Sequence, residues 1–363
     1  MGKRIKLIDL FYYLAWCFLL VGEFYIYKNN QIRNILSVIA MLFCILVIVM
    51  NKYTIKEFFY FIVFLYIAMN IKSNTNTEAV LILVIFIFAS KNRIKKDLFC
   101  LIYLVQIIKF VIYIFLFTPY AYFINNLKDS SDWITANGLG LLFFEIVAIY
   151  FCYKSFKNKI NVSIVERCTI IVGILIMYAY TGCKTAVICT LFLTFSDKLD
   201  YLMIIGKFIR KNLSKIIIGL IIFIICIAVF NESYDFKSWG TFGARFTSMQ
   251  IYLKQYQISM WGTLIDRDFG PLDLGYFAMV LQYGIVFSVL FFAGLVILIR
   301  KLKNNTILLN VLISMIMYML VERSCFSMSR NPLLILFSLL LFSNSLFNDK
   351  YYKIVREDED AQK

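Results

Sequence analysis

Long apolar runs constrain this chain more than any other feature. A run of about 17 to 25 apolar residues spans the hydrocarbon core as a helix, because lipid offers no partner to an unpaired backbone N–H or C=O group. We predict twelve spans, of which the fourth, seventh and eighth are short. The predicted spans are Leu7–Tyr27, Ile32–Met50, Ile55–Ile71, Thr77–Ser90, Asp97–Phe117, Gly138–Tyr153, Glu166–Tyr180, Gly182–Ser196, Leu213–Phe230, Gly275–Ile299, Thr306–Val321 and Pro332–Leu346.

The composition is typical of a membrane protein and excludes several classes of reaction. The 363 residues are 61% apolar and only 16% charged, unlike a soluble domain. Histidine is absent, which excludes a histidine base, a histidine-ligated metal and a Ser-His-Asp triad. The nine cysteines form no CxxC pair, and we interpret them as small buried hydrophobes. We expect an all-α polytopic membrane protein with a single domain over residues 1–363.

The placement of basic residues predicts the orientation. With the N-terminus inside, the cytoplasmic segments hold 25 of the 37 Lys and Arg residues and the outer segments hold 11. This excess is typical of cytoplasmic loops, so we expect both termini inside and a cytoplasmic tail at 347–363. The net charge of +15 needs no nucleic acid. Clusters such as Lys91–Lys96 are inner-face topology signals that also favour anionic lipid.

The predicted outer face carries one long loop, residues 231–274, between the ninth and tenth spans. A loop of 44 residues is expected to contain structure of its own. Within Arg245–Met260, apolar residues recur at three- and four-residue steps, which predicts an amphipathic helix lying on the outer membrane surface. These residues are Phe246, Met249, Tyr252, Tyr256 and Met260.

Charged residues near the predicted outer turns point to an anion site. Lys184, Arg323 and Arg330 violate the positive-inside tendency beside short outer turns. For each alone, contact with a lipid headgroup is an equal alternative, and a local ion pair explains Arg323 beside Glu322. Together the three basic residues predict an anion-binding site on the outer face.

Five stretches resemble the O-antigen and capsule polymerases and ligases (the Wzy and WaaL families). TGCKTA at Thr181–Ala186 resembles their TGSRTA turn. The ARF…WG stretch at 244–262 resembles their arginine-bearing outer loop, and LDLGYFAMVLQYG at 272–284 resembles their DNGYL…YG segment. TANGLG at Thr135–Gly140 and SRNPLLILFSLLL at 329–341 are similar to segments before and after these. The five stretches occur in the family's order.

The resemblance implies a GT-C-like membrane glycosyltransferase. Such an enzyme polymerises undecaprenyl-diphosphate-linked repeat units on the outer side of the bacterial cytoplasmic membrane. The implied partners are the lipid-linked oligosaccharide, the lipid bilayer, a chain-length regulator and a flippase. No cofactor and no metal is implied, because basic side chains would stabilise the leaving diphosphate.

The resemblance also assigns residues. Arg245 takes the diphosphate-binding role, and Lys184 stands where the family's turn arginine stands, without the planar donor fork. Asp273 stands where the ligases have a histidine. The missing histidine favours a polymerase and leaves Asp273 as the candidate base, with a helix cap as its structural alternative and Glu322 as the next candidate. The further candidate substrate contacts are Arg267, Tyr276, Arg323 and Arg330.

Two charges lie deep in predicted spans. Lys109 and Glu145 are each roughly 10–12 Å from the outer ends of consecutive spans, at 1.5 Å per residue, so we predict that they form a structural buried ion pair. A transporter or lipid-linked oligosaccharide flippase remains an alternative function, since twelve spans are equally typical of it. Few central charges and no internal repeat count against transport. An O-antigen-type ligase is a third alternative.

Overall fold

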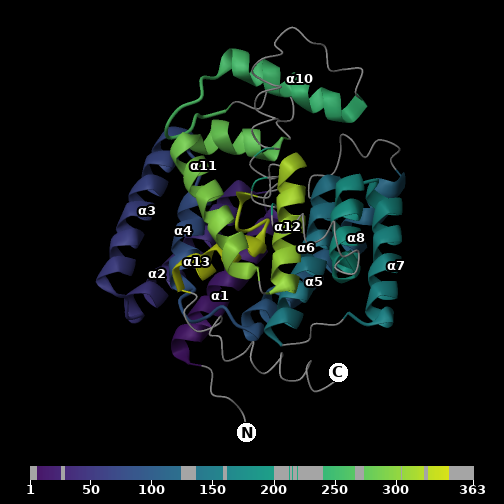
Figure 1. Ribbon diagram of the computed structural model, residues 1–363, viewed down its shortest axis with the longest axis horizontal. Coiled ribbons are helices and arrows are strands. Elements are labelled where there is room, and N and C mark those ends of the chain that lie inside the picture. Colours follow the sequence, from purple (N-terminus) through teal and green to yellow (C-terminus); the bar gives the residue numbers. More distant parts are fainter. Residues whose placement is uncertain are drawn as a thin grey trace.

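The computed structural model describes residues 6–25, 29–123, 136–157, 162–199, 212, 215, 219, 240–265, 274–303, 305–322 and 326–342. All regular secondary structure in these ranges is helical, which confirms the predicted all-α class. Figure 1 shows the helices gathered in a bundle, with α10 across one end, here called the α10 end. The elements are α1 (Leu7–Gly22), η1 (Glu23–Tyr25), α2 (Asn30–Met50), α3 (Ile55–Thr75), α4 (Ala79–Ala89), α5 (Lys96–Phe123), α6 (Ala136–Phe156), α7 (Ile164–Thr181), α8 (Lys184–Leu199), α10 (Gly240–Gln255), α11 (Gly275–Leu302), α12 (Thr306–Val321), η4 (Pro332–Ser338) and α13 (Leu339–Phe342).

Among the described residues, six helices are long and apolar enough to cross a membrane. They are Leu7–Tyr25, Asn30–Met50, Lys96–Phe115, Asn137–Phe156, Ile164–Thr181 and Gly275–Leu302. Four shorter apolar helices accompany them, at Ala79–Ala89, Lys184–Ser196, Thr306–Leu320 and Pro332–Phe342. Together with α3, which covers the predicted span Ile55–Ile71, helices occur at eleven of the twelve predicted spans. Most of the ninth, Leu213–Phe230, and the predicted tail at 347–363 lie outside the described residues.

Local sequence signals set where the helices begin and end. Thr54 and Ser163 cap α3 and α7, and in each case a glutamate three residues later, Glu57 or Glu166, completes a capping box. Gly182 ends α7 with φ 61°, the left-handed conformation that glycine adopts without steric cost. Four of the eight backbone groups that these two helix starts leave without intrahelical partners are therefore satisfied by side chains.

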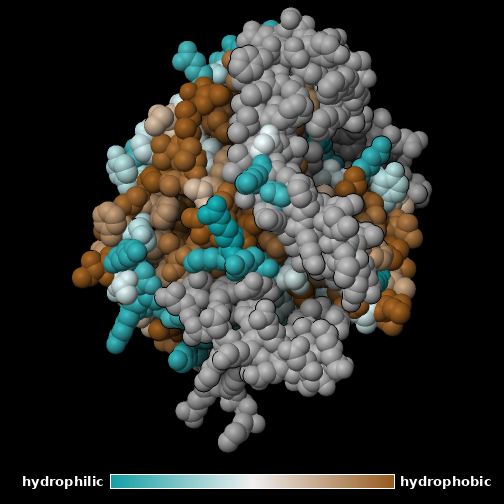
Figure 2. Space-filling model, viewed as in Figure 1, coloured by the Kyte–Doolittle hydropathy of each residue, from teal (hydrophilic) through white to brown (hydrophobic). Residues whose placement is uncertain are grey.

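The helices divide into a lipid-facing outer set and an enclosed core. Figure 2 shows apolar side chains along both flanks of the visible face, where Figure 1 places α3 and α7. Exposed apolar residues of these two helices and α2 include Ile35, Val49, Phe59, Ile62, Val172 and Leu175. Helix α4 has only 11 residues, about 16 Å, and nine of them are buried. Its length and burial are those of a core helix.

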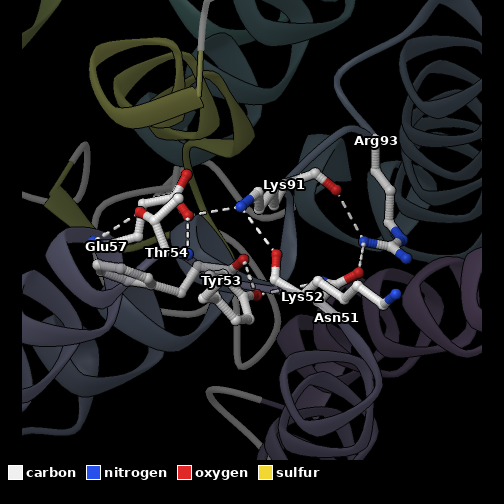
Figure 3. Close-up of polar contacts among 8 residues, drawn as sticks. Asn51, Lys52, Tyr53, Thr54, Glu57, Lys91 and Arg93 are labelled. Carbon is white, nitrogen blue, oxygen red and sulfur yellow. Dashed lines mark hydrogen bonds and ion pairs between the residues drawn. The ribbon is translucent and has the colours of Figure 1, made fainter.

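Side-chain polar bonds join the helices at the end opposite α10. The buried Arg93 guanidinium lies 3.1 Å from Asp9 of α1 and donates to Asn51, between α2 and α3, at 3.0 Å. Lys91 pairs with Glu57 of α3 and donates to the Lys52 carbonyl (Figure 3). We call this group the Arg93 rim. Half of the predicted basic cluster Lys91–Lys96 is therefore engaged inside the protein.

Helix α11 is broken at Gly284, where the sequence predicts one straight span. Gly284 has φ 83° and ψ 173°, so an N-terminal arm, 275–283, precedes the long segment of α11. The freed backbone groups find partners in the loop that follows α10. Thr263 N–H donates to the Leu281 carbonyl, and Ile285 and Val286 N–H groups donate to residues 259 and 260. Three backbone hydrogen bonds thus join the break in α11 to the loop after α10.

A helix occurs near the predicted place, but α10 spans Gly240–Gln255 rather than Arg245–Met260, and its buried apolar stripe does not face lipid. Phe246, Met249 and Tyr252 are buried against the α11 arm, where they contact Phe277 and Leu281. The prediction of a helix lying on the membrane surface by this stripe is therefore wrong. An apolar stripe on a helix can be buried equally well against lipid or against protein, and the sequence alone does not distinguish the two.

The last predicted span is also corrected. Pro332–Ser338 forms a buried 3₁₀ helix followed by the single turn α13, in place of a continuous α-helix over Pro332–Leu346. Pro332 at its first turn lacks an N–H group, and Lys301 of α11 binds the carbonyls of Leu339 and Leu340. Partners from another helix thus satisfy backbone groups that an α-helix would satisfy itself.

Candidate functional site

The TANGLG and TGCKTA stretches meet at the α10 end. Gly140 of α6 approaches the α7–α8 turn so closely that a Cβ atom there would lie 2.8 Å from Cys183 Sγ. On its other side Cys183 Sγ lies 3.7 Å from the Tyr318 hydroxyl of α12. Tyr318 also stacks on Phe144 of α6. The absence of a side chain at Gly140 is therefore required for α6, α8 and α12 to pack at this point.

The α7–α8 turn presents a positive charge to the surface. Thr181 Oγ1 accepts from the Cys183 N–H at 3.1 Å, and Gly182 provides the left-handed corner. Lys184 is the first residue of α8 and is exposed. A lysine at a helix N-terminus adds its charge to the unpaired N–H groups of the first turn, an arrangement that binds anions such as phosphate.

Helix α11 begins in contact with the end of α12. A Cβ atom at Gly275 would overlap the Met319 carbonyl and lie 2.9 Å from the Glu322 carbonyl oxygen. Tyr276 is buried, and its hydroxyl donates to the Ile316 carbonyl at 3.1 Å. The candidate substrate contact Tyr276 therefore faces the protein interior, where it ties α11 to α12.

Arg245 lies on α10. The loop after α10 packs against α11 through two glycines, Gly262 of the WG dipeptide and Gly284 of the YG dipeptide. Both have positive φ, 90° at Gly262 and 83° at Gly284. A Cβ atom at Gly284 would overlap the backbone of Gly262 and Met260. This contact joins the loop after α10 to the break in α11, and Arg245 is partly exposed one residue before the buried Phe246.

The remaining predicted site residues either lie outside the described residues or lie away from the α7–α8 turn. Asp273, Arg267 and Arg323 lie outside the described residues. Arg330, before η4, pairs through Nε with Glu23 Oε1 at 2.8 Å. It therefore belongs to a different group of charges from the α7–α8 turn.

That second group is a central polar cluster between α5, α6, η1 and the segment before η4. Lys109 and Glu145 are 3% and 1% exposed, in agreement with their predicted depth, and Lys109 acts electrostatically on Glu145. The predicted ion pair is replaced by a different contact: Gln106 Nε2 donates to Glu145 Oε2 at 2.9 Å. Glu23 is also buried. Sequence reasoning missed Gln106 and Glu23, although both are polar residues within apolar runs.

The described residues hold no group of three or more His, Cys, Asp or Glu side chains that could bind a metal ion. Comparisons with protein-family models, with curated proteins and with solved structures gave no match.

Proposed function

We propose that the chain is a membrane polysaccharide polymerase that joins undecaprenyl-diphosphate-linked repeat units. The observation that supports the proposal is that stretches resembling the polymerase family contact each other in the folded protein. The TANGLG and TGCKTA stretches are in direct contact through Gly140 and Cys183, which are 43 positions apart in the sequence. The α11 stretch contacts both α12 and, through Gly284, the arginine-bearing loop.

In the proposed reaction the anomeric carbon of one lipid-linked chain is attacked by a sugar hydroxyl of another. The C–O bond to the diphosphate breaks as the new glycosidic bond forms, and a single displacement inverts the anomeric centre. Arg245 and Lys184 would stabilise the charge on the departing diphosphate. Asp273 would accept the hydroxyl proton.

Extension of a lipid-linked repeat unit by the purified protein in lipid tests the proposal directly. Wild-type protein should lengthen the substrate, which gel electrophoresis of the released glycan detects. Arg245→Lys should lose most of the activity, because lysine keeps the charge but has no planar donor fork. Lys254→Met is a matched control, since Lys254 is an exposed cation on the same helix. An inactive wild type, or a fully active Arg245→Lys, would contradict the proposal.

Asp273→Asn separates the proposed base from a helix cap. Asparagine accepts a hydrogen bond at a helix start nearly as well as aspartate but cannot take a proton. We expect this variant to be stably expressed and to bind lipid-linked substrate without extending it. Normal extension would move the proposed base to another carboxylate, with Glu322 as the next candidate.

One observation favours a lipid-linked oligosaccharide flippase as the second candidate. The central polar cluster brings four ionisable groups together inside the bundle, and intramembrane charges are typical of transport pathways. A flippase would move the same substrate across a vesicle membrane without lengthening it. The extension assay, repeated on sealed vesicles with a probe for substrate on each side, therefore distinguishes the two functions.

A further inference from the structure

The central polar cluster contains an unusual pair of planar groups. Gln106 and Glu145 are 0% and 1% exposed, and one hydrogen bond, Nε2 to Oε2 at 2.9 Å, joins them. The other oxygen of each group, Oε1 of Gln106 and Oε1 of Glu145, is buried without a hydrogen-bond partner. A buried polar atom without a partner costs about 1 to 3 kcal/mol, and more for a charged group, so two in one pair require an explanation.

The surrounding charges do not supply the missing donor. The ionisable groups that act on Glu145 are Lys109 of α5, Glu23 of η1 and Arg330. Arg330 is already paired with Glu23. Lys109 is attracted to both glutamates but forms no ion pair within 4.0 Å among the described residues.

We propose that Glu145 is a proton-binding site and is held as a neutral carboxylic acid at neutral pH. Of the four terminal atoms in the Gln106 and Glu145 groups, three are oxygens and one is an amide nitrogen. A proton on Glu145 Oε1 would let it donate to Gln106 Oε1 while Gln106 Nε2 donates to Glu145 Oε2. One proton thus satisfies both oxygens and avoids an ionised carboxylate in the core.

The cluster extends from Glu145 to the partly exposed Arg330. Lys109 interacts electrostatically with Glu145 and Glu23, and Glu23 binds Arg330, whose side chain is 26% exposed. Proton release breaks the carboxyl O–H bond and leaves a carboxylate facing the Lys109 ammonium. The net charge of Glu23, Lys109, Glu145 and Arg330 then changes from +1 to zero. The site therefore carries a reversible charge within the bundle, whatever reaction takes place at the α10 end.

Infrared spectroscopy of the purified protein in lipid tests this proposal without an activity assay. A protonated carboxylic acid has a carbonyl band distinct from that of carboxylates, and the band shifts when the acid is deuterated. We expect wild-type protein to show this band at neutral pH, and Glu145→Gln to lose it while keeping the wild-type melting temperature, because a glutamine can form the same planar pair. Glu57→Gln is the matched control and should leave the band unchanged, since Glu57 is ion-paired with Lys91.

Absence of the band in wild-type protein, or its persistence in Glu145→Gln, would overturn the proposal. If Glu145→Gln does not yield folded protein, Gln106→Leu decides the matter. This change leaves the acid in place and removes its partner, so the band should shift to the position of a carboxyl group without a hydrogen bond. A band unchanged by Gln106→Leu would equally overturn the proposed pair.

Discussion

The two ends of the helix bundle are held together by different means. At the Arg93 rim, charged side chains bridge α1, α3 and the loops between helices, with Arg93 and Lys91 each binding more than one partner. At the α10 end, the closest contacts are made where a side chain is absent. The glycines concerned are Gly140, Gly262, Gly275 and Gly284.

The two ends also differ in how their cations are engaged. At the Arg93 rim, Arg93 contacts Asp9 and Asn51, and Lys91 pairs with Glu57. Near the α10 end Lys72 pairs with Glu78, whereas Lys184 is exposed at the α7–α8 turn.

The largest effect is expected for Gly284→Ala at the α10 end. The added Cβ would overlap the backbone of Gly262 and Met260, and alanine is strained at φ 83°. We expect a loss of roughly 3 to 5 kcal/mol in stability from overpacking and strain together, measured by thermal unfolding in detergent. Gly294→Ala is the control in the same helix, since its Cβ would meet only side-chain atoms, the nearest at 3.1 Å. Equal stability of the two variants would contradict the glycine interpretation.

At the Arg93 rim, Arg93→Met should cost about 2 to 3 kcal/mol, because it leaves Asp9 and Asn51 without their partner. This expected loss of stability is smaller than the roughly 3 to 5 kcal/mol for a fully buried pair, because the Asp9 side chain is 28% exposed. Lys95→Met, an exposed residue of the same basic cluster, should change stability by less than about 0.5 kcal/mol. Matching melting temperatures for the two variants would show that charge pairing does not hold this rim.

A smaller effect is expected at the contact between α6 and the α7–α8 turn. Gly140→Ala should cost about 1 to 2 kcal/mol, because its Cβ would lie 2.8 Å from Cys183 Sγ. Adding Cys183→Ala removes the sulfur and should recover part of this loss, although the Cys183 Cβ, at 2.9 Å, remains. Additive losses in the double variant would mean that the two side chains do not share this space.

The smallest effect is expected for the exposed ion pair between α3 and the start of α4. Lys72 and Glu78 lie 3.0 Å apart, with side chains 41% and 31% exposed. Lys72→Met should therefore change stability by less than about 0.5 kcal/mol. A loss above about 1 kcal/mol would show that the rule of weak surface pairs fails for this protein.

Much of the fold could be predicted from the sequence because each helix carries its own signals. Apolar length located eleven of the described helical segments, and capping residues such as Thr54 and Ser163 fix helix starts through bonds only three residues apart. Thr306–Val321 was predicted with the observed bounds. The break at Gly284 and the 3₁₀ geometry after Pro332 were not predictable, because their backbone partners come from distant segments.

The candidate site was predictable only as a set of separate stretches. The sequence marked Lys184, Arg245, Gly262 and Gly284, and it placed Lys109 and Glu145 at similar depth. It did not reveal that Gln106, rather than Lys109, forms a hydrogen bond with the Glu145 side chain. Pairing inside a bundle depends on rotations of helices about their axes, which hydropathy does not specify.

The apolar runs are enough to predict a membrane environment, because 61% apolar residues in long runs can satisfy their backbone groups only as helices in lipid or packed against each other. Which surface each helix packs against is set by the folded arrangement. The α10 stripe faces α11 rather than lipid, and Arg330 pairs with Glu23, 307 positions away in the chain. Apolar burial is non-directional, so only the packed arrangement selects among partners that the sequence leaves equivalent.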